Sequence, residues 1–258
     1  MHTVLITGAT EGIGFAAGCR FAERGHQVAL NGIVPHASMQ TRLQSQPASV
    51  RQNLHYFEAD LRQPANIEAM ITEVESQLAS VDIVINNAAV RQFEAVEDCT
   101  TDAWDAALSV NLSSAFHTAR LTIAKMKENG WGRIINMSSV YGLRAAVNRV
   151  DYVTTKHALI GLTKSIALET RAYGITCNAL CPATVMTPQI TARIAAASDN
   201  QGISLETAQT QYLATRQGSG RFIMPEQIVA MMEFLCSDAA CEITGAALPI
   251  DGGWTAES

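Results

Sequence analysis

The sequence predicts an α/β fold in which one doubly wound parallel sheet of about seven strands carries helices on both faces. Short apolar runs rich in β-branched residues alternate along the chain with longer segments of helical periodicity, as in parallel sheets covered by helices. A glycine-rich turn joins the first apolar run directly to the first helical segment. The chain has 258 residues, of which 48% are hydrophobic, and this is enough to form one large core.

The expected strands and helices follow one another without a break that would divide the chain. Strands are expected at 3–6, 27–31, 54–59, 81–86, 132–137, 174–180 and 246–250. Helices are expected at 12–24, 64–79, 102–129, 151–173, 204–215 and 225–237. No repeat, low-complexity tract or long linker separates these segments, so residues 1–258 are expected to form a single domain.

Residues 184–224 interrupt the alternation between the sixth and seventh expected strands. This segment contains helical pieces and the glycine-rich stretch QGSGR. Long insertions without a strand in compact domains often cover a binding site. The segment is therefore expected to be a lid over the substrate.

Charge and composition argue against several classes of partner. The net charge is −6, the sequence pI is about 5.5 and no basic block occurs, so nucleic acid is not expected to bind. The N-terminus lacks the features of a signal peptide, and no apolar run approaches the roughly 20 residues of a membrane span. A cytoplasmic protein without a membrane segment is expected. Cys177 and Cys181, and likewise Cys236 and Cys241, lack matching ligands, so no metal site is expected.

The turn after the first strand reads TGATEGIG over residues 7–14. Glycine permits a tight turn and lets a phosphate approach the N–H groups at the start of the next helix. The spacing is not the usual G-x-G-x-x-G, and a plain strand-to-helix turn would use the same glycines. The position between a leading strand and a helix favours a Rossmann-type dinucleotide site. The residues expected to contact the dinucleotide here are Gly8, Thr10, Glu11, Gly12, Ile13 and Gly14.

The cofactor is expected to be NAD rather than NADP. The second strand ends at Asn31, with neither an acid for the ribose 2′-hydroxyl nor an arginine for a 2′-phosphate. Glu11 lies inside the glycine turn, where a carboxylate would repel a 2′-phosphate. Asn31, at the end of that strand, is also expected to contact the cofactor.

Tyr152 and Lys156 lie one helical turn apart, so their side chains share one face of the helix expected at 151–173. A free tyrosine is a poor base near neutral pH, but a neighbouring ammonium stabilises the phenolate and lowers its pKa. Such a tyrosine takes a hydroxyl proton while hydride leaves the same carbon. Ser139 follows the fifth strand, at the sheet edge where doubly wound folds bind ligands, and is expected to hold the substrate oxygen.

Over its whole length, the sequence resembles the short-chain dehydrogenase/reductase family. The shared motifs are TGATEGIG at 7–14, Asp60-Leu61 after the third strand, NNA at 86–88, Asn111 in a long helix, Ser139, the YxxxK pair of Tyr152 and Lys156, and Pro182 followed by Thr187-Pro188. The resemblance implies that Lys156 also holds the nicotinamide ribose. It further implies that Asn111 bends its helix and holds a water that relays protons to Lys156.

The same resemblance implies further cofactor contacts. Asp60 and Leu61 would border the adenine, and Asn87 the adenosine ribose. Val185 and Thr187 would hold the nicotinamide carboxamide.

Within that family, stretches such as GWGRIINMSSVYGL and KHALIGLTKSIALET are similar to bacterial D-3-hydroxybutyrate dehydrogenases. In those enzymes two glutamines, a histidine and a lysine hold a short carboxylate, and a tryptophan closes the pocket. The matching positions here are Arg91, Tyr141, Arg149, Thr184 and Arg193. The planar fork of arginine suits carboxylate or phosphate, so an anionic substrate is expected, although side chains of this length can also extend into solvent.

These observations predict an oxidoreductase that transfers hydride between NAD and the secondary alcohol or ketone of a small acidic substrate of the 3-hydroxy acid type. Two alternatives remain: a reductase of 3-oxoacyl thioesters carried by acyl carrier protein, and a non-catalytic dinucleotide sensor. Long helices with apolar residues on more than one face must bury a second surface. A homotetramer is therefore expected, since family relatives pair the helices at 102–129 and 151–173.

Overall fold

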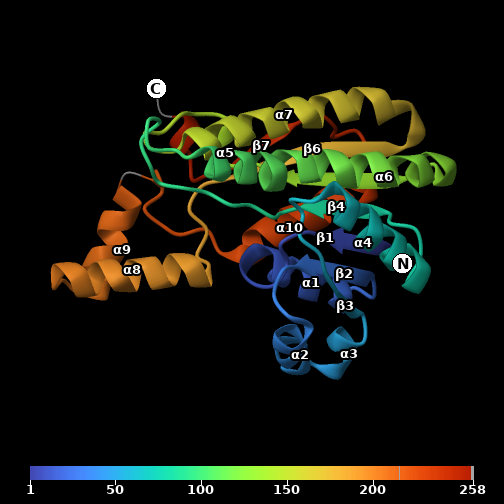
Figure 1. The fold of residues 1–258 in the computed structure, drawn as a ribbon, viewed down its shortest axis with the longest axis horizontal. Helices are drawn as coiled ribbons and strands as arrows, with labels where there is room; N and C mark the ends of the chain where they lie inside the picture. The colour runs from blue at the N-terminus through green and yellow to red at the C-terminus, as the bar shows by residue number, and fades with distance from the viewer. Residues whose placement is uncertain (215, 257–258) are drawn as a thin grey trace.

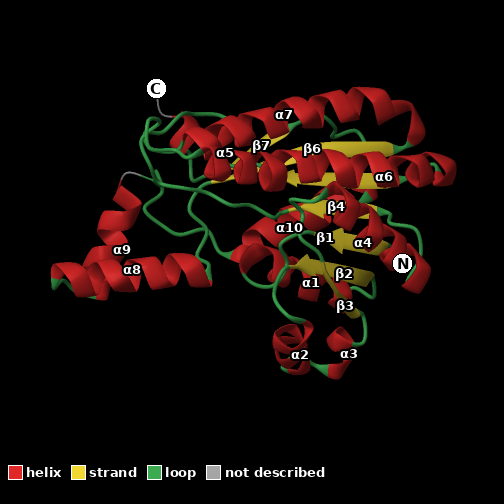
Figure 2. Ribbon diagram, viewed as in Figure 1, coloured by secondary structure: helices red, strands yellow, loops and turns green. Residues whose placement is uncertain are grey.

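The computed structural model describes residues 1–214 and 216–256, and these form a seven-stranded sheet in which all neighbouring strands are parallel. The strand order is β3-β2-β1-β4-β5-β6-β7 (Figures 1 and 2). The strands are β1 (Thr3–Ile6), β2 (Gln27–Gly32), β3 (Leu54–Glu58), β4 (Ile83–Asn86), β5 (Gly132–Met137), β6 (Ile175–Pro182) and β7 (Ala247–Ile250). The chain reverses its direction of winding between β1 and β4, and such a switch point is where doubly wound sheets bind ligands.

Helices cover both faces of the sheet, as the sequence predicts. They are α1 (Gly12–Glu23), α2 (His36–Gln44), α3 (Ala48–Arg51), α4 (Pro64–Gln77), α5 (Thr101–Leu108), α6 (Ser114–Asn129), α7 (Val150–Thr170), α8 (Pro188–Gln201), α9 (Leu205–Ala214) and α10 (Pro225–Cys236). On one face the apolar sides of α1 and α10 pack onto the sheet, and on the other those of α4, α6 and α7. No helix among the described residues is long and apolar enough to cross a membrane.

Outside residues 184–224, two helical regions differ from the expectation. Helices α2 and α3 lie where no element was predicted, because Met39 and Val50 are their only buried residues and so few apolar positions give no periodic signal. The helix predicted at 102–129 is divided by a π-helical turn at Ser109–Ser113, which contains Asn111. A π turn inserts one extra residue and often marks a functional position.

Residues 184–224 form a hairpin of α8 and α9 that stands out from the sheet at the left of Figure 1. The hairpin has its own apolar cluster, centred on the buried Ile190, Ile194 and Ala208. Its two ends meet where Val185 pairs with Ile223 in an isolated parallel bridge. The sequence predicted one helix here, at 204–215. The structure has two, and residue 215 lies outside the described part of the chain.

Candidate active site

A cavity of about 840 Å³ lies at the carboxyl ends of the strands. The predicted site residues that line it are Gly8, Thr10, Glu11, Gly12, Ile13, Asn31, Asp60, Leu61, Asn87, Arg91, Ser139, Tyr141, Arg149, Tyr152, Lys156, Thr184, Val185, Thr187 and Arg193. Gly14 and Asn111 are the predicted residues outside this lining. Sequence motifs that lie far apart in the chain therefore converge on one cavity.

The glycine turn has the form of a phosphate cradle. Gly8 and Gly12 have φ values of 60° and 58°, a left-handed conformation that favours glycine. A Cβ on Gly14 would lie 2.6 Å from Asn87 Nδ2, so a larger residue would displace that amide. No side chain caps α1 at Glu11, which leaves the first N–H groups of the helix available to an anion. The residues present therefore fit a dinucleotide pyrophosphate.

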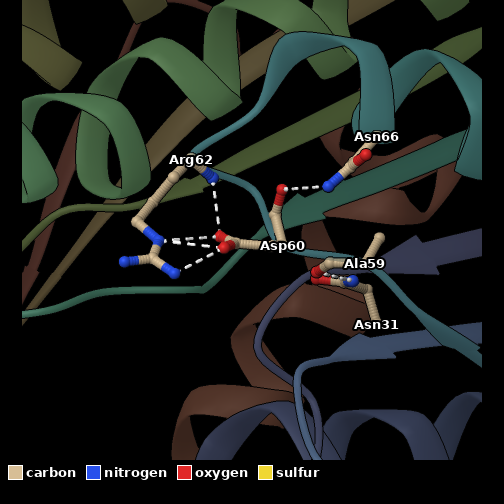
Figure 3. Close-up of polar contacts among 5 residues, drawn as sticks. All are labelled: Asn31, Ala59, Asp60, Arg62 and Asn66. Carbon is tan, nitrogen blue, oxygen red and sulfur yellow. Dashed lines mark hydrogen bonds and ion pairs between the residues drawn. The ribbon is translucent and has the colours of Figure 1, made fainter.

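Two asparagines hold the loops around this turn. Asn87 donates from Nδ2 to the carbonyl oxygens of Thr7 and Gly8, at 3.0 and 2.9 Å. Asn31 is buried and donates from Nδ2 to the Ala59 carbonyl at 3.1 Å (Figure 3). Both amides line the cavity while tying neighbouring strand ends together.

Asp60 is paired with an arginine that the sequence analysis did not single out. The Arg62 guanidinium donates from Nε to both carboxylate oxygens of Asp60, at 3.0 and 2.9 Å, and from Nη2 to Oδ2 at 2.6 Å (Figure 3). These hydrogen bonds to Arg62 lower the pKa of Asp60, so the carboxylate is charged and already has a partner. Asn66 reaches the Asp60 carbonyl from α4 at 3.5 Å. Arg62 also lines the cavity.

Ser139, Tyr152 and Lys156 meet at the floor of the cavity, where all three are buried. Lys156 Nζ lies 5.3 Å from the centre of the Tyr152 ring and donates to the Met137 carbonyl at 2.6 Å. The Ser139 hydroxyl accepts from the Tyr141 N–H at 3.2 Å. Tyr152 and Lys156 lie on the first turns of α7, and Ser139 follows the carboxyl end of β5.

The pKa values at this floor differ from the expectation for the pair. Burial raises the pKa of Tyr152 above its usual value, although the charges of Arg91 and Arg149 and the nearby Ser139 hydroxyl oppose the rise. Burial, reinforced by the charge of Arg91, lowers the pKa of Lys156 to about 7. The net rise for Tyr152 runs against the lowering expected beside Lys156, because desolvation of the buried side chain outweighs the charges of Arg91 and Arg149.

Asn111 supports the loop above the catalytic floor and does not line the cavity. In the π turn its Oδ1 accepts from the Val90 N–H at 2.7 Å and its Nδ2 donates to the Val90 carbonyl at 2.8 Å. Nδ2 also donates to the Thr155 hydroxyl at 3.1 Å. Asn111 thus joins the π turn to α7 beside Lys156 and fixes the backbone just before Arg91.

The predicted substrate end of the cavity is cationic and aromatic. The guanidinium carbons of Arg149 and Arg193 lie 4.3 and 4.5 Å from the centre of the Phe93 ring, and that of Arg91 lies 5.7 Å from it. Arg91 also lies 6.0 Å from the centre of the Tyr152 ring. Each of the three predicted arginines therefore lies close to Phe93, beside the catalytic floor.

The cavity lining also includes residues that were not found from the sequence, among them Gln189, Tyr212, Arg216 and Trp254. None of these four belongs to a motif, and their contribution depends on how the hairpin and the C-terminal segment fold back over the sheet. The Trp254 ring packs edge-on against Tyr141 at 5.7 Å, and Arg144, which lies outside the cavity, donates to the Trp254 carbonyl at 2.8 Å.

Comparisons with known proteins find similar proteins over nearly the whole chain. The family profile described as Enoyl-(Acyl carrier protein) reductase matches residues 8–255. D-beta-hydroxybutyrate dehydrogenase of Cupriavidus necator is 38% identical over 255 residues, covering 99% of this chain and 98% of that protein. The structure of 4-hydroxyisoleucine dehydrogenase complexed with NADH is similar with a TM-score of 0.87, 30% identity and full coverage of both chains. The structure of a variant actinorhodin polyketide ketoreductase with NADPH has a TM-score of 0.88 and 29% identity, with 98% of this chain and 97% of that chain covered.

Proposed function

Because the chain belongs to the short-chain dehydrogenase/reductase family, we propose that it is an NAD-dependent dehydrogenase that reversibly oxidises the secondary alcohol of a small acidic substrate of the 3-hydroxy acid type. One observation carries the proposal: Ser139, Tyr152 and Lys156 lie at the floor of a cavity whose glycine turn fits a dinucleotide and whose opposite end is lined by arginines. The similarity to D-beta-hydroxybutyrate dehydrogenases supports the substrate class.

The oxidised dinucleotide, when bound, supplies a hydride acceptor and a positive charge. Ser139 holds the substrate oxygen at the end of β5, and Tyr152 removes the hydroxyl proton as the carbon loses hydride. Arg91 and Arg149 lower the pKa of Tyr152 against the effect of burial, and so favour the phenolate that proton removal requires. In the reverse direction the protonated Tyr152 returns the proton to the carbonyl oxygen.

The preference for NAD rests on the charges near the adenosine end. Glu11 lines the cavity beside the glycine turn, and Arg62 is paired with Asp60. Arg42 extends from α2 to the Thr10 carbonyl and packs on the Phe15 ring at 5.5 Å, outside the cavity lining. Among the residues that line the cavity there, a ribose 2′-phosphate would therefore meet the Glu11 carboxylate, while the lining cation Arg62 is already paired with Asp60.

A second candidate function is the reduction of 3-oxoacyl thioesters. It is favoured by the description of the matching profile and by the similarity to a polyketide ketoreductase. The same arginines would then meet the phosphate of a carrier. A non-catalytic dinucleotide sensor would have no use for the buried catalytic groups, so it is the weaker alternative.

A substrate and cofactor panel tests the proposal. We expect the purified protein to oxidise free 3-hydroxy acids with NAD, and to do so more slowly with NADP. The absorbance of the reduced nicotinamide measures both rates. Turnover of 3-oxoacyl thioesters in preference to free acids would support the second candidate. Dinucleotide binding without turnover of either class would support the sensor.

A further inference from the structure

Four arginines, one more than the sequence analysis found, line the substrate end of the cavity. Arg91 and Arg149 belong to the body of the fold, after β4 and before α7. Arg193 lies on α8, and Arg216 follows α9, so these two belong to the hairpin. Body and hairpin therefore contribute two positive charges each to one space.

The described residues supply no anion to these arginines. Glu11 and Asp60 are the acidic residues that line the cavity, and both lie beside the dinucleotide elements. Among residues 1–214 and 216–256, none of the four arginines forms a salt bridge.

Their hydrogen bonds are also few. Within the described part of the chain, Arg91 donates to Gln189 at 2.8 Å and Arg216 to the Tyr212 carbonyl at 2.9 Å, both neutral acceptors. The guanidinium groups of Arg149 and Arg193 pack against aromatic rings and donate no hydrogen bond to a described residue. Most of the N–H donors of this group therefore lack an acceptor in the described protein.

The charges of Arg91 and Arg216 repel that of Arg149. Arg149 is half-buried, and its pKa is lowered by burial and, more weakly, by the charges of Arg91 and Arg216. Aromatic faces attract a cation but carry no net charge. Several guanidinium groups held around Phe93 therefore gain most from a ligand with more than one negative charge.

We propose that the substrate is a secondary alcohol with two anionic groups, of which one is a carboxylate. This rests on the proposed function and narrows its substrate class. Arg91, nearest to Tyr152, binds one of the two anionic groups. Arg149, Arg193 and Arg216 bind the second group, and the two hairpin arginines thereby hold α8 and α9 over the cavity.

Two substrates that differ by a single carboxylate test this directly. In 3-hydroxyglutarate a carboxymethyl group replaces the methyl group of 3-hydroxybutyrate. We expect kcat/KM to be at least about tenfold higher for the diacid, because charge-assisted hydrogen bonds are the strong ones. The monomethyl ester of the diacid keeps about the same length but carries only one negative charge. Its kcat/KM should therefore lack the increase expected for the diacid. The analogue 3-hydroxy-4-phosphobutyrate distinguishes a phosphate from a carboxylate as the second group.

A binding measurement separates this inference from the proposed function. Glutarate and butyrate lack the hydroxyl group, so their affinities for protein saturated with NAD, measured by calorimetry, do not depend on turnover. We expect glutarate to bind at least about tenfold more tightly than butyrate, and R193Q or R216Q to remove most of this difference. The control R51Q, at an exposed arginine on α3 outside the cavity, should preserve it.

Equal affinity for glutarate and butyrate, or a preference for glutarate that survives both hairpin substitutions, would overturn the inference. A preference for glutarate without oxidation of any hydroxy acid would leave the dianion site standing and remove the proposed reaction instead.

Discussion

Burial moves the pKa values of Tyr152 and Lys156 in opposite directions, and both shifts favour the neutral side chain. Neither shift can be inferred from the YxxxK spacing. That spacing places the two side chains on one helix face, but only the packing around α7 determines that water is excluded from them.

Tyr152→Phe retains the ring and removes the group that transfers the proton. Turnover should fall by at least about 100-fold, the usual scale for a positioned acid or base, because no other group replaces the hydroxyl. Steady-state kinetics measure the loss, and NADH fluorescence titration should show that dinucleotide binding survives. Near-normal turnover in the variant would rule out Tyr152 as the proton carrier.

Lys156 gives the free energy of unfolding a pH dependence. Its pKa is about 7 when folded against a usual 10.5, so between these values the unfolded chain binds more protons and stability rises with pH. Between pH 7 and 9 the rise should be about 2 kcal/mol, and Lys156→Met should remove it. Urea unfolding of both proteins at fixed concentration measures the difference in slope. Parallel pH profiles would show that Lys156 keeps its usual pKa.

Glu11→Lys replaces a carboxylate beside the glycine turn with a cation. The ratio of kcat/KM for NAD to that for NADP should fall by about tenfold or more, since repulsion of a 2′-phosphate becomes attraction. Kinetics with both cofactors decide this. A wild-type preference for NADP would contradict the charge argument, whatever the variant does.

At the scale of elements, all seven strands and most helices could be predicted, because buried parallel strands are short apolar runs and the helices between them are amphipathic. Two kinds of feature could not be predicted from the sequence. Helices α2 and α3 bury too little to show a period. Arg216 and Trp254 reach the cavity only through the tertiary fold, which the sequence pattern does not show. Ser139 could be predicted at the cavity, because the carboxyl ends of parallel strands meet at one edge of the sheet.

The turn between β1 and α1 offers a test of close approach. A Cβ on Gly8 would lie 2.6 Å from the Ala88 Cα, so Gly8→Ala should force the loops after β1 and β4 apart and weaken dinucleotide binding by about tenfold or more. Gly130→Ala is the matched control, with a similar φ of 66° and no atom within 4 Å of the added methyl. It should cost about 1–2 kcal/mol of stability and leave binding intact. Calorimetry and thermal unfolding compare the Gly8→Ala and Gly130→Ala proteins. An equal loss of dinucleotide affinity in both would mean that backbone strain, and not the contact with Ala88, weakens binding.

At the scale of the whole molecule, α6 and α7 lie side by side and leave large apolar side chains on the surface (Figure 1). Phe116 is 49% exposed and Leu168 is 64% exposed. We propose that these helices pair across a two-fold axis in a homotetramer. Light scattering at micromolar concentration should give a tetramer, and Phe116→Asp should lower the mass. Leu205→Asp, at a 50% exposed position on α9, is the control that should leave it unchanged. A monomeric wild type would contradict the proposal.

The hairpin of α8 and α9 holds its own apolar cluster, separate from the two clusters that pack against the sheet. Substitutions within it therefore disturb few of the contacts that keep the strands together. Natural selection can alter this wall of the cavity while the catalytic floor is preserved, and an engineer can graft a different hairpin after Thr187 and before Ile223, close to the bridge at which the chain already closes on itself. New substrate ranges would then arise on an unchanged chemical scaffold.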